Sequence, residues 1–123
     1  MFVRGIRGAV TVESNTSLDI ISNTENLLTE IFKQNDIKKE DLVSIIFTMT
    51  SDLDAAFPAI AARQMGITDV SLLCMNELNV KNGLKKCIRV LIQVNTEKSN
   101  SDIKHIYLKD ARSLRPDLNR GNS

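Results

Sequence analysis

The stretch LCMNELNVKNGLKKCIRVLIQV, residues 73–94, contains most of the polar chemistry of this chain and sets its architecture. Its apolar ends predict two β-strands, over residues 70–75 and 87–95, and the loop between them, over residues 79–86, contains Gly83. In the second strand apolar residues alternate with Arg89, Leu91 and Gln93, so one face of the strand carries an arginine. We expect Arg89 to be buried, and a buried arginine is costly unless an anion meets it. The stretch therefore predicts a site for a small carboxylate.

The composition is that of an ordinary globular protein. The chain has 123 residues, of which 42% are hydrophobic and 25% charged, and its formal net charge is +1. This balance argues against nucleic acid and anionic membranes as partners, because both require a clustered basic excess. No apolar run approaches the roughly 20 residues that cross a bilayer, and Arg4 and Arg7 interrupt the apolar core that a signal peptide would have. We expect a cytosolic protein with one domain over residues 1–118 and a flexible tail over residues 119–123.

The rest of the chain completes a β-α-β-α-β-β-β order. Alternating patterns predict further strands over residues 2–12, 42–50 and 103–108. A long amphipathic helix is expected from a cap at Thr16 to about Asn35, and a shorter helix between Pro58 and Gly66. This order predicts an α+β fold, a mixed five-stranded sheet with two helices on one face.

Two features of the predicted sheet point to close contacts. Gly5 and Gly8 flank Arg7 in the first strand, which indicates a bulge or a close approach of the backbone to a neighbouring element. The face of the sheet without helices includes Leu91, and we expect other subunits to bury it.

Basic side chains are the main candidates for an anion site, and they are Arg7, Arg63, Arg89, Arg115 and the pair Lys85 and Lys86. Arginine suits planar, bidentate recognition of carboxylates. Neither a nucleophile–base pair nor a zinc-type spacing of cysteine and histidine is present, and His105 is more typical of a structural residue. Cys74 and Cys87 are expected to be free thiols. The residues alone indicate a carboxylate binder and leave open whether it is an enzyme.

Five blocks then carry a resemblance to a known family: RGIRGAVTVE (4–13), DAAFPAIAAR (54–63), CMNELNVKNGLKKCIRV (74–90), HIYL (105–108) and LRPDL (114–118). Together they resemble the small monofunctional chorismate mutases of the trimeric, mixed α/β class, over nearly the whole chain. Two positions depart from the family pattern, since Ile60 stands where relatives carry a lysine and Leu73 where a hydroxyl residue is usual.

The resemblance implies a ferredoxin-like, chorismate-mutase-like subunit. Three such subunits would form a pseudo-α/β-barrel with active sites between neighbours. It also implies the conversion of chorismate to prephenate by a [3,3] Claisen rearrangement, in phenylalanine and tyrosine biosynthesis, with no cofactor and no metal. Selection of the reactive conformer and electrostatic stabilisation of the transition state would supply the catalysis.

Residue roles follow from the same resemblance. Arg89 would face the ether oxygen, Glu77 would accept from the ring hydroxyl with Cys74 beside it, and Arg7 would bind a carboxylate. These four form the predicted catalytic set. The predicted substrate-binding set is Arg7, Phe57, Arg63, Cys74, Glu77, Arg89, Tyr107, Leu114 and Arg115.

Two alternatives remain open from the sequence. One is an imine deaminase of the Rid type, which also binds a carboxylate with an arginine between subunits. The other is a non-catalytic carboxylate-binding protein of similar trimeric fold.

Overall fold

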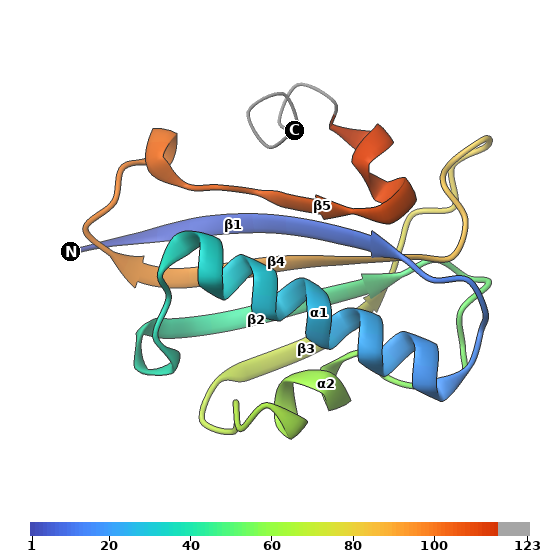
Figure 1. Ribbon diagram of the computed structural model, residues 1–123, viewed down its shortest axis with the longest axis horizontal. Helices are drawn as coiled ribbons and strands as arrows, with labels where there is room; N and C mark the ends of the chain where they lie inside the picture. The colour runs from blue at the N-terminus through green and yellow to red at the C-terminus, as the bar shows by residue number, and fades with distance from the viewer. Residues whose placement is uncertain (116–123) are drawn as a thin grey trace.

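Two long antiparallel strands form the centre of the sheet. In the computed structural model, which describes residues 1–115, β1 (Phe2–Thr11) pairs with β4 (Cys87–Thr96) along its whole length. β2 (Leu42–Met49) is antiparallel to the other edge of β4, and β3 (Ser71–Asn76) is parallel to β2. The short β5 (Ile106–Leu108) is parallel to β1. The strand order is β3-β2-β4-β1-β5, the mixed five-stranded sheet that the sequence predicts (Figure 1).

Both α-helices cover the same face of this sheet (Figure 1). α1 (Ser17–Asn35) begins at the predicted cap, where Oγ1 of Thr16 accepts a hydrogen bond from the Asp19 backbone N–H at 3.1 Å. α2 (Ala59–Gln64) follows Pro58, and Gly66 takes the positive φ of 84° that suits glycine after a helix. Three short 3-10 helices complete the chain, η1 (Lys39–Asp41), η2 (Asn100–Asp102) and η3 (Lys109–Leu114).

Gly8 allows α1 to lie directly on β1. A Cβ atom at Gly8 would lie 2.7 Å from Cδ1 of Ile31 and 3.1 Å from the backbone oxygen of Ile106. The β1–β4 register is continuous here, so the glycine marks a close approach of the helix and not a bulge. The irregularity of the sheet lies instead in β2, where the register shifts between Leu42 and Ser44.

β5 is shorter than the predicted strand, because side chains, and not a neighbouring strand, form hydrogen bonds with the backbone here. Asn35, at the end of α1, bonds to both the N–H and the carbonyl of Lys104, each at 2.8 Å. The Arg7 backbone N–H donates to Nδ1 of His105 at 2.9 Å, where a strand would offer a carbonyl. Regular pairing therefore begins at Ile106 and not at residue 103. Asn35 is itself buried, so α1 fixes this segment from within the protein.

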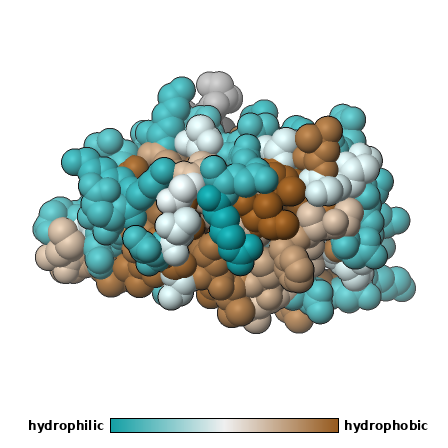
Figure 2. Space-filling model, turned by 90° about the horizontal axis from the view of Figure 1, so that it is seen from below, coloured by the Kyte–Doolittle hydropathy of each residue, from teal (hydrophilic) through white to brown (hydrophobic). Residues whose placement is uncertain are grey.

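The face of the sheet away from the helices is open and partly apolar. The fractional exposure is 55% for Leu73, 53% for Met75 and 38% for Leu91. The register places Leu73, Ile46, Leu91 and Arg7 side by side on this face, which we call the open face. Figure 2 looks at the β3 and α2 side from below and shows hydrophobic surface along the lower margin of the molecule.

Within residues 1–115, none of the helices is long and apolar enough to cross a membrane. In the same part of the chain, no group of three or more acidic, histidine or cysteine side chains is placed to hold a metal ion.

Candidate active site

An ion pair joins the two ends of the loop between β3 and β4. Nε of Arg89, on β4, lies 3.1 Å from Oε2 of Glu77, which follows β3 directly. The same carboxylate oxygen accepts a hydrogen bond from the hydroxyl of Thr48 at 2.7 Å. The Arg89 side chain is 44% exposed and that of Glu77 21% exposed. The expectation that Arg89 is buried is therefore wrong for the single chain, although an anion does meet it.

The ion pair belongs to a row of residues that crosses the open face. The register aligns Met75 of β3 with Thr48 of β2, Thr48 with Arg89, and Arg89 with Ala9 of β1. Ala9 in turn aligns with Tyr107 of β5. Paired residues on neighbouring strands share one face, so the sheet itself brings Arg89 and Tyr107 to the same side of the molecule.

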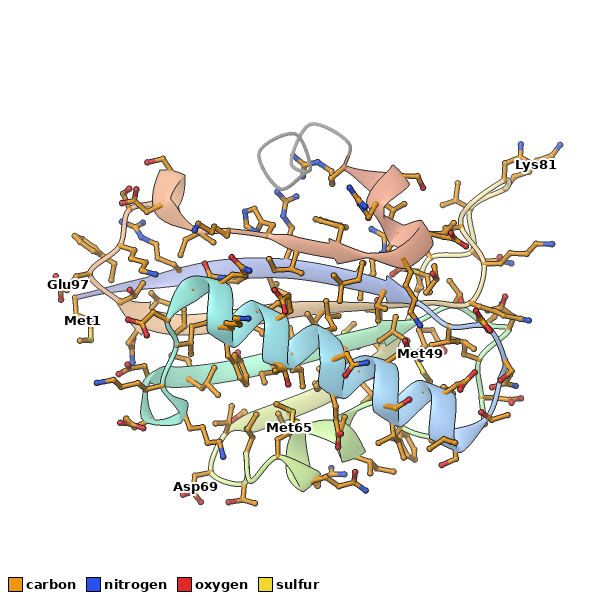
Figure 3. All side chains as sticks on the ribbon, viewed as in Figure 1. Met1, Met49, Met65, Asp69, Lys81 and Glu97 are labelled. Carbon is orange, nitrogen blue, oxygen red and sulfur yellow. The ribbon has the colours of Figure 1, made fainter. Side chains whose placement is uncertain are left out.

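A hollow of about 810 Å³ lies over this end of the sheet. It is bounded by Glu77, Arg89 and Cys87, by residues 50–52 that follow β2, and by residues 78–85 of the β3–β4 loop. The loop projects from the body of the molecule, with Lys81 near its tip (Figure 3). The volume suits a small organic ligand.

Cys87 closes the floor of the hollow as a neutral thiol. Its side chain is 1% exposed and packs with Ala9, Tyr107 and Ala111. Burial raises the pKa of the Cys87 thiol to about 11, against the opposing effect of the Arg89 guanidinium. Both cysteines are free, as predicted.

Positive charge gathers beside this row on the β1 and β5 edge. Burial, together with the nearby charges of Arg7 and Arg115, lowers the pKa of His105 below its usual 6.5. A neutral imidazole can accept at Nδ1, as it does from the Arg7 backbone. His105 thus has a bonded partner, as a structural residue would, and its structural role stays a prediction.

The remaining predicted residues fall into two groups. Tyr107 and Leu114 pack in the cluster around Cys87, close to the ion pair. Cys74 lies on the opposite face of the sheet, aligned with the buried Phe47 and packed against the core. Phe57, which is 67% exposed, and Arg63 belong to the α2 region on that same helical side of the molecule.

Three polar residues next to the ion pair were missed by the sequence reasoning: Thr48, Thr50 and Asp52. They contact Glu77 or the start of β4. Thr48 alternates with apolar neighbours in a predicted strand, on the side of β2 opposite Phe47. That pattern could have indicated that its hydroxyl faces the same side as Arg89.

Comparison with known proteins gives the family. The model of the family "Chorismate mutase type I" matches residues 3–118. The chain belongs to the type I chorismate mutases. It is 46% identical to the chorismate mutase AroH of Bacillus subtilis over 96% of this chain and 94% of that one. It is 47% identical to the AroH protein of Thermus thermophilus, over 94% of this chain and 96% of that one.

A solved structure agrees. A chorismate mutase from Clostridium thermocellum superposes with a TM-score of 0.89 at 54% identity, covering 90% of this chain and 99% of the other. The predicted family and fold are thereby confirmed, and so is the main functional prediction, an isomerase of aromatic amino acid biosynthesis. The comparisons support this activity and not the deaminase or the non-catalytic binder.

Proposed function

We propose that the hollow around Arg89 and Glu77 is one half of the active site in which this type I chorismate mutase converts chorismate to prephenate. The observation that supports this most directly is the ion pair, which aims a guanidinium and a carboxylate into the same hollow. The reaction breaks a carbon–oxygen bond and forms a carbon–carbon bond within one molecule, so it requires no proton transfer. Fixed charge and an enforced conformation are then the two contributions that the protein can make.

Arg89 supplies the positive charge in this proposal. Negative charge grows on the ether oxygen as the carbon–oxygen bond breaks, and a fixed guanidinium stabilises it. Because Nε of Arg89 is engaged by Glu77, the two terminal amino groups of the guanidinium are the donors directed at the substrate. Glu77 holds the guanidinium in that orientation.

Glu77 supplies the negative charge. Both of the contacts that its carboxylate makes within residues 1–115, from Thr48 and Arg89, are on Oε2. The other oxygen, Oε1, is then the acceptor offered to the hydroxyl of the substrate ring. A carboxylate at that place also favours the positive charge that develops on the ring.

The substrate carboxylates would meet the arginines and Tyr107. Arg7 and Tyr107 lie on the open face beside the ion pair, and Leu114 and Arg115 follow them in the chain. We assign these four residues to the same half of the site. Phe57, Arg63 and Cys74 lie toward the helical side, so we assign them to the half that a neighbouring subunit contributes.

A homotrimer would bring these two halves together. Leu73, Met75 and Leu91 leave a hydrophobic patch on the open face, and patches of this kind are typical of subunit interfaces. We propose that this face forms the centre of the trimer, that residues 1–118 form one domain, and that the enzyme works in the cytoplasm. The predicted tail over residues 119–123 lies outside the described residues.

The test is a chorismate-to-prephenate assay on the purified protein and on Arg89→Ala. We expect the wild-type chain to consume chorismate and the variant to lose about a hundredfold to a thousandfold in kcat. Lys38→Ala is the matched control, since it removes an exposed cation that does not line the hollow. Near-full activity in Arg89→Ala would overturn the assignment of the site.

A further inference from the structure

Residues at the end of β2 and in the turn after it contact both ends of the β3–β4 loop. Thr48 contacts Glu77 at the start of the β3–β4 loop, and Asp52 contacts Lys86 at its end. Neither Thr48 nor Asp52 has a part in the chemistry proposed above. We propose that the end of β2 and the turn that follows it form a positioning element, in which Thr48 and Asp52 set the geometry between Glu77 and Arg89. The inference rests on the proposed site and deepens it.

Thr48 acts on Glu77. It lies between the two charged residues, aligned with Arg89 on one side and with Met75, two residues before Glu77, on the other. Its hydroxyl and the Arg89 guanidinium bond the same carboxylate oxygen, at 2.7 and 3.1 Å. A glutamate has several rotatable bonds, and two donors on one oxygen restrict them. The second donor thus directs Oε1 of Glu77 into the hollow.

Asp52 acts on the start of β4. Its Oδ2 accepts from the Lys86 backbone N–H at 2.9 Å, and its Oδ1 accepts from the Thr50 hydroxyl at 2.5 Å. Thr50 pairs in turn with Cys87, accepting the Cys87 backbone N–H on its hydroxyl at 3.0 Å. These hydrogen bonds fix the position of the backbone at the start of β4.

The backbone at this entry is strained. Lys86 has a positive φ of 50°, which costs free energy for a residue with a side chain. The two Asp52 oxygens that accept from its N–H hold it in this conformation. Arg89 follows three residues later, on β4, so a shift at Lys86 would move the guanidinium relative to Glu77.

The test on Thr48 uses Thr48→Val, which keeps the shape and removes the hydroxyl. We expect kcat to fall about tenfold, the value of one hydrogen bond to a charged group, with KM changed less than kcat. Thr48→Ser should restore most of the activity, and Thr48→Ala serves if the valine variant does not fold. The control is Ser44→Ala, on the same face of β2, whose hydroxyl bonds Gln93 at 2.7 Å and not Glu77.

A double-mutant cycle separates positioning from stability. If Thr48 acts through Glu77, Thr48→Val should change kcat less than about twofold when made in Glu77→Ala. An equal loss in both backgrounds, or an activity in Thr48→Val within about twofold of wild type, would overturn the role of Thr48.

Asp52→Ala is expected to lower kcat about tenfold, because Lys86 is released. Asp102→Ala, which removes an exposed carboxylate at the end of η2 that accepts from Ser99, is the control and should leave kcat unchanged. Unchanged kcat in Asp52→Ala would overturn the role of Asp52. If Arg89→Ala and Glu77→Ala were themselves fully active, the proposed site would fail first. If those two lose activity while Thr48→Val and Asp52→Ala do not, only this inference fails.

Discussion

Nε of Arg89 lies 3.1 Å from Oε2 of Glu77, across the loop that connects β3 to β4. Both side chains are partly exposed in the single chain, and an exposed pair of this kind contributes only about 0–1 kcal/mol to folding. The pair therefore contributes little to the stability of the fold, and its main role is to orient Arg89 in the site. It fixes a planar cation by one edge and presents its terminal N–H groups to the hollow.

Arg89→Lys tests whether the planar guanidinium, with its several N–H donors, is required. A lysine keeps the charge, but a single ammonium cannot bond Glu77 from one edge and present two fixed donors to a substrate. We expect kcat to fall about a hundredfold or more while the protein remains folded. The rate of chorismate consumption gives kcat, and circular dichroism shows whether the variant is folded. A lysine variant within a few-fold of wild type would show that charge alone is enough.

Leu91→Glu tests the open face as the subunit interface. Burying a charge in an apolar interface is costly, so the variant should be monomeric and inactive at concentrations where the wild-type chain forms the proposed trimer. Leu18→Glu is the control, because Leu18 is as apolar and more exposed but lies on α1, on the other side of the sheet. Light scattering gives the mass. A trimeric Leu91→Glu, or a monomeric wild-type chain, would contradict this interface.

The strands of the sheet could be predicted because their alternation is strong. Ile88, Val90, Ile92 and Val94 are all buried in the core, on the face that their spacing indicates. The spacing also placed Arg89 on the opposite face. It could not show that this face is open in a single chain, since exposure depends on what covers the sheet.

The geometry of the site was harder to predict, because it depends on contacts between distant segments. Glu77 and Arg89 lie on opposite sides of a loop, so their distance depends on how that loop folds. The hydrogen bond that holds Lys86 comes from Asp52, in the turn after β2. Cys74 illustrates a second difficulty. In a short apolar strand either face can point to the core, and only the pairing with Phe47 settles which one does.

Asn35→Ala tests the bond network that ends the fifth strand early. Asn35 is 3% exposed, and its side-chain amide satisfies both backbone groups of Lys104. Removing the amide leaves these groups unpaired, so we expect the free energy of unfolding to fall by about 2–3 kcal/mol. Urea denaturation at fixed protein concentration measures it. The neighbouring Gln34→Ala removes only an exposed bond to Glu30 and should cost less than about 0.5 kcal/mol. Equal losses in the two variants would contradict the role of Asn35.

Cys87→Ala tests the buried thiol beneath the hollow through the pH dependence of stability. Burial raises the pKa of Cys87 from 9.0 to about 11 in the folded chain, whereas in the unfolded chain the thiol ionises near its ordinary value. Ionisation therefore favours the unfolded state as pH rises from 9 to 11, and the contribution is constant below pH 9. The wild-type free energy of unfolding should fall more steeply over that range than that of Cys87→Ala, by up to about 1.4 kcal/mol per pH unit. Urea denaturation of both proteins from pH 7 to 11 measures the two slopes. Parallel slopes above pH 9 would mean that the thiol ionises in the folded chain as easily as in the unfolded one.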